Sequence, residues 1–111
     1  MQSLTFDNYQ KQANFTELCG HRIAHWHSLN FQTNLKQETI VFIHGFPSAS
    51  WDWHLQWKHL AGQYGLLSLD LLGFGLSAKP YPHQYSLLEQ ADIAEALLKQ
   101  FAVKQVHILA H

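Results

Sequence analysis

Two short turn motifs hold the residues that are most suited to chemistry. The first is HGFP, His44 to Pro47, which directly follows the apolar run Ile40–Ile43. Gly45 can adopt backbone angles that other residues resist, and Pro47 has no N–H of its own. The motif therefore predicts a sharp turn in which the Phe46 amide points outward. A free amide at a strand end can bind a developing oxyanion, although the same four residues also suit an ordinary strand-to-helix turn.

The second motif is DLLGFGLSAKP, from Asp70 to Pro80. Gly73, Gly75 and Ala78 have the G-x-G-x-x-A spacing of a dinucleotide-binding fingerprint. That fingerprint needs a helix to begin at its last position and to hold a pyrophosphate on its free amides, and the prolines that follow oppose such a helix. We therefore interpret the motif as a structural loop formed by Asp70, Gly73, Gly75 and Ser77. A small nucleotide-binding protein is the least favoured hypothesis.

Other chemically capable residues lack the partners that they would need. His25 and His27 share one face of a predicted strand, but zinc needs three or four ligands and no third lies at a fixed spacing. Ser48, Ser50 and Ser77 are not in a G-x-S-x-G elbow. We interpret Ser50 as a helix cap and Ser77 as a hydrogen-bonding residue of the loop. The sequence predicts no metal site and no cofactor.

The apolar pattern predicts the elements that position these motifs. A hairpin is expected over 15–29, with a turn at Cys19 and Gly20. Continuous apolar runs indicate buried parallel strands at 40–43, 66–70 and 106–110. Helices are expected over 51–64 and 87–102. Strands and helices that alternate in this way predict an α/β protein with a mostly parallel sheet and helices on its faces.

Both helices carry end signals and one apolar stripe. Ser50 is placed to cap the first helix and Gly65 to stop it. Ser86 and Glu89 have capping-box spacing at the start of the second helix. The predicted stripe of the first helix consists of Trp53, Trp57, Leu60, Ala61 and Tyr64. The predicted stripe of the second consists of Leu87, Ala91, Ala94, Leu98 and Phe101.

Composition limits the class of protein. The chain has 111 residues, of which 47% are hydrophobic, and we expect one unit with a polar leader at 1–14 and the sheet with two helices at 15–111. Its net charge of −1 argues against nucleic acid as a partner. No stretch resembles a secretory signal or a membrane span. Cys19, the only cysteine, is expected to be a half-buried free thiol. These features favour a soluble cytoplasmic protein.

Three phrases in this order resemble the amino-terminal half of an α/β-hydrolase: VFIHGFPSASWDW, LDLLGFGLSAKP and VHILAH. The resemblance runs from about residue 21 onward and is strongest to the branch of epoxide hydrolases, haloalkane dehalogenases and mesoderm-specific transcript proteins. It implies that the Phe46 amide is one oxyanion-hole donor and that a cis Phe46–Pro47 bond would fit. Dehalogenases usually have asparagine at the position of Phe46, so dehalogenation is disfavoured.

The resemblance also implies that the catalytic centre is incomplete in this chain. Ala110 and His111 match the first two positions of the family's nucleophile elbow, and the nucleophile, the orienting acid and the base histidine would follow them. We therefore expect a truncated or split hydrolase. Its complete form would cleave a small apolar ester, epoxide or related substrate through a covalent nucleophile, and the chain alone would be inactive.

A sheet that stops at the strand 106–110 would expose an apolar edge, so marginal stability or self-association is expected. The alternative hypothesis is a non-catalytic interaction module that pairs through this edge.

Overall fold

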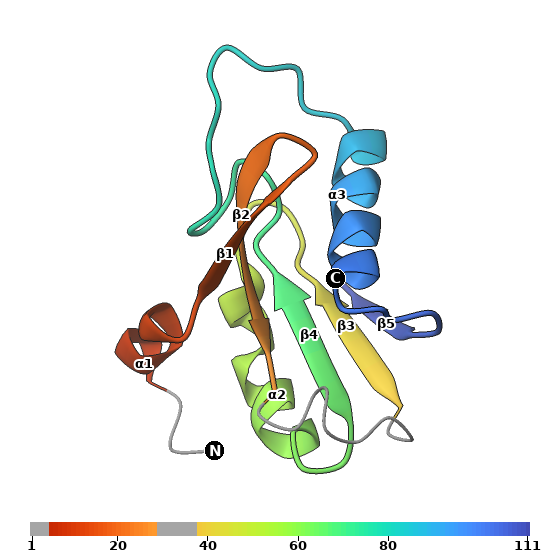
Figure 1. Cartoon of the computed structure of the whole chain (residues 1–111). Helices are drawn as coiled ribbons and strands as arrows, with labels where there is room; N and C mark the ends of the chain where they lie inside the picture. Colours follow the sequence, from red (N-terminus) through yellow and green to blue (C-terminus); the bar gives the residue numbers. More distant parts are fainter. Residues whose placement is uncertain (1–4, 29–37) are drawn as a thin grey trace.

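The computed structural model describes residues 5–28 and 38–111. These residues form five strands, three α-helices and one 3-10 helix (Figure 1). In chain order the elements are α1 (Phe6–Lys11), β1 (Asn14–Leu18), β2 (His21–His27), β3 (Thr39–Ile43), η1 (Ser50–Trp53), α2 (His54–Leu60), β4 (Gly65–Leu69), α3 (Leu87–Gln100) and β5 (His107–Ala110).

The predicted hairpin is confirmed as β1 and β2, which pair antiparallel with Leu18 opposite His21. Cys19 and Gly20 both have positive φ, 52° and 84°, which matches the tight primed turns whose twist suits a two-residue hairpin. The prediction for the thiol is wrong, because Cys19 is exposed. A residue at the tip of a hairpin has no neighbouring element to cover it.

The predicted α/β class is confirmed by the sheet, whose strand order is β1-β2-β4-β3-β5. β4 and β5 lie on either side of β3 and run parallel to it, whereas β2 pairs antiparallel with β4. The parallel strands place their carboxyl ends at one edge of the sheet. The turns after β3 and β4, which hold the two motifs, therefore lie next to each other.

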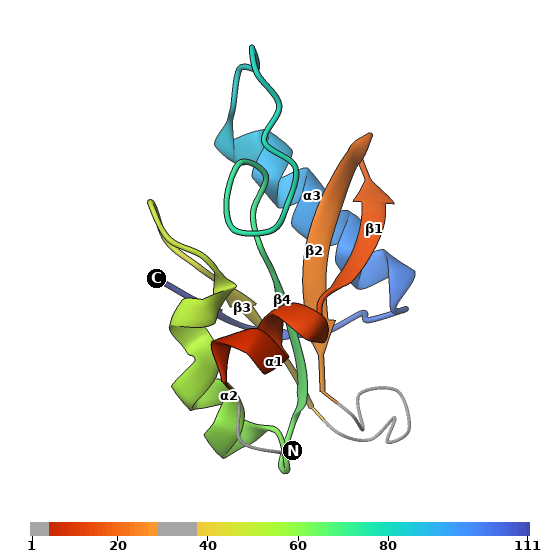
Figure 2. The same ribbon diagram turned by 90° about the vertical axis from the view of Figure 1, so that its left-hand side faces the viewer.

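Helices cover both faces of the sheet. α1 and α2 lie on one face and α3 on the other (Figure 2). Alternate side chains of β3 point to these two layers: Phe42 belongs to an aromatic-rich core with Trp57, and Val41 belongs to an aliphatic core with Ile93 and Leu97. Both cores contain fully buried residues, so the sheet is the central layer of a three-layer arrangement.

The leader contains a helix that the sequence pattern did not predict. Thr5 caps α1, because its side chain accepts a hydrogen bond from the Asn8 amide. Six residues are too few for a stable isolated helix, so tertiary contacts must hold it. Tyr9 is buried against Trp26, with ring centroids 4.2 Å apart, and its carbonyl accepts a hydrogen bond from the Trp26 indole.

The helix predicted over 51–64 is shorter than expected and begins differently. The segment starts as η1 and becomes α-helical only over His54–Leu60. Its predicted apolar stripe does pack against the aromatic-rich core. The capping role of Ser50 is wrong: Ala49 occupies the cap position without a side-chain hydrogen bond. Ser50 is drawn inward because its hydroxyl donates to the buried Asp70 carboxylate, at 2.7 Å.

The helix predicted over 87–102 is confirmed as α3, which begins at the Ser86 cap. The Glu89 amide donates to the Ser86 hydroxyl at 3.1 Å. The predicted stripe is only partly right, because the fully buried residues are Ile93 and Leu97, while Leu87 is 88% exposed. The helix turns Ile93 and Leu97 onto the sheet, and Leu87 lies in its exposed first turn.

The strand predicted at 106–110 exists as β5. Its predicted burial is wrong, whereas the exposed apolar edge expected for a sheet that stops at this strand is present. All four of its residues are exposed. β5 pairs with β3 at the outer position of the sheet, and Ile108 is 63% exposed. An apolar sequence alone does not bury a strand whose faces no helix covers.

Candidate functional site

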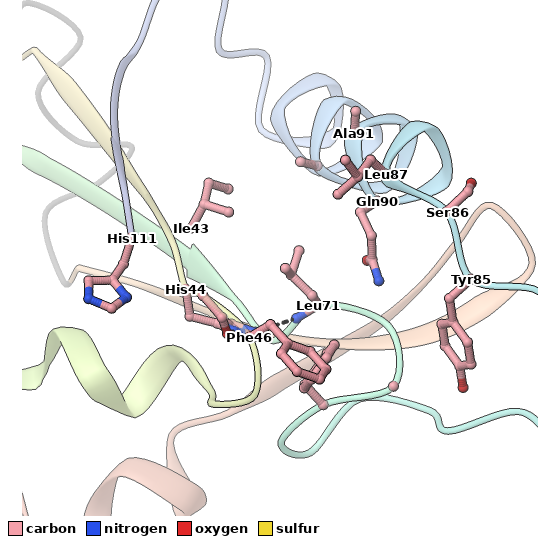
Figure 3. Close-up of a pocket in the computed structure, with 14 residues that line it drawn as sticks. Ile43, His44, Phe46, Leu71, Tyr85, Ser86, Leu87, Gln90, Ala91 and His111 are labelled. Carbon is pink, nitrogen blue, oxygen red and sulfur yellow. Dashed lines mark hydrogen bonds between the residues drawn. The ribbon is translucent and has the colours of Figure 1, made fainter.

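A pocket of about 890 Å³ lies at the carboxyl ends of β3, β4 and β5 (Figure 3). The turn after β3, the loop after β4, the first half of α3 and the residue after β5 form its walls. The lining residues are Ile43, His44, Gly45, Phe46, Leu71, Gly73, Phe74, Tyr85, Ser86, Leu87, Gln90, Ala91, Ala94 and His111. Most of these side chains are apolar, so the pocket suits an apolar ligand with a few polar contacts.

The predicted HGFP turn forms one wall of this pocket. The Phe46–Pro47 bond is cis, and the Ser48 amide donates to the Gly45 carbonyl at 3.2 Å. The Phe46 side chain is 86% exposed. Among residues 5–28 and 38–111, no hydrogen-bond acceptor meets the Phe46 amide. An amide without a partner at the end of a strand is available to a ligand oxygen.

Gly45 is required by a close approach of two backbones. A Cβ at this position would lie 2.9 Å from the His111 carbonyl oxygen, which is closer than real Cβ contacts. The His111 amide in turn donates to the Ile43 carbonyl at 3.2 Å. The turn after β3 and the residue after β5 are therefore in direct contact at the mouth of the pocket.

His44 does more than shape the turn, because it links the two predicted motifs. The Leu71 amide donates to Nε2 of this buried imidazole at 2.9 Å. Since Nε2 accepts, the ring proton of the neutral form is on Nδ1, which donates to the Gly45 carbonyl at 2.9 Å. Both ring nitrogens are thus engaged, and His44 is held as a structural bridge rather than as a free base.

Asp70 organises the loop after β4. Its buried Oδ1 accepts hydrogen bonds from the Ser50 amide at 2.8 Å and the Ser50 hydroxyl at 2.7 Å. Oδ2 accepts from the Leu76 amide at 2.8 Å. The Tyr9 hydroxyl contacts the Ser50 hydroxyl, and burial followed by the Asp70 charge raises the pKa of Tyr9. These donors compensate the cost of burying the carboxylate.

Two of the other predicted loop residues, Gly75 and Ser77, pack around Asp70, whereas Gly73 faces the Tyr85 ring. Gly75 has φ of 54°, and a Cβ there would overlap the Asp70 carboxylate. The Ser77 hydroxyl donates to the Asp70 carbonyl at 2.6 Å and accepts from the Ala24 amide at 2.9 Å. No helix begins at Ala78, because the next helix in the chain is α3. The helix that a dinucleotide fingerprint needs is therefore missing here.

The contribution of α3 to the pocket was not predicted. Gln90 fixes the loop to the helix through two hydrogen bonds: the Leu72 amide donates to its Oε1 at 3.0 Å, and its Nε2 donates to the Leu72 carbonyl at 2.9 Å. Leu87 and Ala91 line the same wall. Both residues belong to the apolar stripe predicted for this helix, and that stripe could have indicated a pocket wall. The stripe was interpreted instead as a surface that packs on the core.

The histidines of β2 do not form a metal pair. His25 is buried and its Nε2 lies 2.9 Å from the Thr16 hydroxyl, whereas His27 is exposed. Burial, with a smaller contribution from His27, lowers the pKa of His25 to about 4. His25 is therefore neutral at pH 7 and belongs to the core side of the strand.

The pocket lacks an arrangement for nucleophilic catalysis within the described part of the chain. Ser86 is its only lining serine there, and the hydroxyl of this residue serves as the cap of α3. The sole lining histidines in the same residues are His44, which is held at both nitrogens, and His111 beside Gly45. The pocket as described offers a hydrogen-bond donor and apolar walls.

The fold and this pocket agree with the result of comparison with known families. Residues 38–111 match the family described as the alpha/beta hydrolase fold. This is well over half of the chain, so the chain belongs to the α/β-hydrolase fold family. The resemblance inferred from the HGFP and DLLGFGLSAKP phrases is confirmed.

Individual relatives support the same family assignment. The chain is 44% identical over 77 residues to the mesoderm-specific transcript protein of Mus musculus, a match that covers 67% of this chain and 23% of the relative. It is 47% identical over 73 residues to LipZ of Mycobacterium tuberculosis, which is named as a hydrolase, with 66% of this chain and 25% of LipZ covered. The chain thus spans about a quarter of these relatives.

A solved structure gives the same result in three dimensions. An alpha/beta hydrolase fold protein from Burkholderia ambifaria superposes with a TM-score of 0.77 at 31% identity, covering 90% of this chain and 34% of that one. Among the described residues, no helix is long and apolar enough to cross a membrane.

Proposed function

We propose that this chain supplies the oxyanion-hole turn and part of the substrate pocket of a hydrolase. The complete enzyme cleaves a small apolar ester, epoxide or related molecule through a covalent nucleophile. The observation that carries the proposal is the Phe46 amide, which has no acceptor among the described residues and lies on an apolar pocket at the carboxyl end of β3. Membership of the hydrolase family supports it.

The chemistry that follows from this geometry is stabilisation of negative charge. When a nucleophile attacks a carbonyl carbon, the carbonyl oxygen gains charge, and an N–H donor aimed at that oxygen lowers the barrier. The Phe46 amide can act as such a donor because the backbone holds it before substrate arrives. Walls built from Ile43, Leu71 and Phe74 favour an apolar substrate.

The proposal assigns the nucleophile, the orienting acid and the base to residues outside these 111. Two observations support this division: the curated relatives are about four times as long as the segment they share with the chain, and the described pocket holds no nucleophile paired with a base. The chain alone is then inactive. We further propose that it requires no cofactor and acts in the cytoplasm; a single cysteine, which cannot form an internal disulfide, supports a reducing environment.

A chimera tests the role of the Phe46 amide. In it, the chain replaces the matched segment of LipZ, and hydrolysis of p-nitrophenyl butyrate and of styrene oxide is measured. Phe46→Pro removes the N–H, whereas Phe46→Ala retains it and serves as the matched control. We expect Phe46→Pro to lower kcat by about 10²-fold to 10³-fold, and Phe46→Ala to have a much smaller effect.

Circular dichroism and thermal unfolding verify that both chimeric variants remain folded. Equal activity of the two variants would remove the Phe46 amide from the mechanism. Turnover by the isolated 111-residue chain, surviving repeated purification, would show that it contains its own nucleophile and would overturn the division proposed above.

The exposed β5 strand favours a second candidate, a non-catalytic module that pairs through its edge. All four β5 residues are exposed, and unpaired strand edges readily add another strand. Under this alternative the purified chain forms a stable complex through β5 and the LipZ chimera is inactive. Activity of the chimera that depends on the Phe46 amide would decide for the hydrolase.

A further inference from the structure

Three potential metal ligands from distant parts of the sequence meet outside the pocket. His21 begins β2, His83 lies in the loop before α3, and Glu89 lies in the first turn of α3. His83 Nε2 is 2.7 Å from Glu89 Oε1, and His21 Nε2 is 3.4 Å from Glu89 Oε2. All three ligand atoms lie within 4.8 Å of one another. This grouping is independent of the proposed hydrolase function.

We propose that His21, His83 and Glu89 bind a divalent transition-metal ion, Zn²⁺ in particular, with water in the remaining position. Two imidazoles and one carboxylate are a known donor set for zinc, at metal–ligand distances of about 2.0–2.2 Å. Ligands at these distances around one tetrahedral ion lie roughly 3–4 Å apart. The observed separations of the three ligand atoms lie close to this range, so side-chain rotations suffice to admit the ion.

The surroundings of the three residues suit an ion that enters from solvent. Side-chain exposures are 20% for His21, 21% for His83 and 25% for Glu89, so the site is accessible yet largely enclosed. The two imidazole rings are nearly perpendicular, at 82°, and both direct Nε2 to the same carboxylate. The neighbouring cation does not compete, because the Arg22 guanidinium lies 4.0 Å from the Phe15 ring centroid.

Metal binding would also affect the pocket wall. The three ligands connect the β1–β2 hairpin, the loop before α3 and α3 itself. Tyr85, Ser86 and Leu87 follow His83 closely and line the pocket. An ion held by His83 would fix this part of the wall to the sheet.

Zinc titration of the full chain by isothermal calorimetry tests the proposal. We compare the unaltered chain with His83→Ala, with Glu89→Gln and with a control, His107→Ala. His107 is suitable because it also faces a glutamate, Glu38, at 3.6 Å, but both side chains are more than 60% exposed. His83→Ala changes an irregular loop and so has little effect on folding.

We expect one zinc ion per chain, at least about tenfold weaker binding in His83→Ala and Glu89→Gln, and unchanged binding in His107→Ala. The visible absorption of Co²⁺ in place of Zn²⁺ gives a second readout, in which a tetrahedral spectrum appears only when all three ligands are present. Circular dichroism verifies folding. Equal zinc affinity in all four proteins, or no one-to-one binding at all, would overturn the proposal.

Discussion

β4 and β5 lie on either side of β3 and both run parallel to it, yet their environments are opposite. Every residue of β4 is buried and every residue of β5 is exposed. Their sequences, GLLSL and HILA, are both largely apolar. β4 has β2 and β3 as neighbours and core residues on both faces, whereas the extensive contacts of β5 within the described structure are with β3 alone.

This difference shows what an apolar run conveys. Such a run indicates that a strand is suited to an apolar environment, but burial itself comes from the elements packed on its faces and edges. In β4 those elements come from both earlier and later parts of the chain. Four pairs of variants test how far the two strands and their surroundings differ.

Shortening one apolar side chain in each strand to alanine gives the most direct test. Leu67 of β4 and Ile108 of β5 both lie opposite Val41 of β3, but their exposures are 0% and 63%. Leu67→Ala should lower the free energy of unfolding by about 2–5 kcal/mol, because it creates a cavity in the core. Ile108→Ala should lower it by less than about 1 kcal/mol. Urea denaturation of the monomeric chain, followed by tryptophan fluorescence, measures both, and similar losses would contradict the contrast.

His25, which lies opposite β4, should make the free energy of unfolding depend on pH. His25 pairs with Leu69 of β4 and has its pKa lowered from 6.5 to about 4, first by burial and then by His27. Between these values only the unfolded chain is protonated, so stability is complete above pH 6.5 and falls as the pH decreases toward 4. The shift corresponds to a loss on the order of 3 kcal/mol.

Urea denaturation at pH values from 7.5 to 4 measures this effect by comparing the unaltered chain with His25→Gln. The stability difference between the two proteins should shrink as the pH falls. His107→Gln, at an exposed histidine of β5, is the control for the replacement of histidine by glutamine. A constant difference for His25→Gln would show that the residue is not buried as a neutral imidazole.

The loop after β4 should depend on the Asp70 carboxylate. Asp70→Asn replaces one of two accepting oxygens with an N–H₂ group that faces donors, so we expect a loss of about 1–3 kcal/mol in the free energy of unfolding. Asp52→Asn, an exposed change in η1, should alter stability by less than about 0.5 kcal/mol. Equal effects in chemical denaturation would mean that the Asp70 hydrogen bonds contribute no net stability.

The exposed face of β5 should affect association more than stability. Ile108→Lys places a charge on the edge strand and should reduce self-association, with a change in unfolding free energy below about 0.5 kcal/mol. Leu55→Lys, at a residue of α2 that is 58% exposed, is the control. Light scattering across a concentration series measures both. Association that is the same in both variants would place the contact elsewhere.

The sequence was most informative where local signals and burial agree. The Cys19–Gly20 turn, the apolar run before His44 and the Ser86 cap each combine a local signal with an element that the fold retains. It was least informative where side chains respond to distant partners. Ser50 is an example: its position favoured a cap, but a buried carboxylate twenty residues away takes its hydroxyl.

The sequence alone was enough to predict the α/β class, the order of strands and α-helices after residue 14, and the two motifs at the carboxyl ends of β3 and β4, because these depend on periodicity and turn chemistry. Three features became visible only in the folded chain: α1 packs its Tyr9 on the sheet, α3 lines the pocket, and His21, His83 and Glu89 meet. Each of these depends on contacts between residues far apart in the chain, and no sequence spacing encodes them. The apolar run of β5 predicted burial and its place at the end of the predicted sheet predicted an exposed edge; the structure has the exposed edge, since burial of a strand is a property of its neighbours.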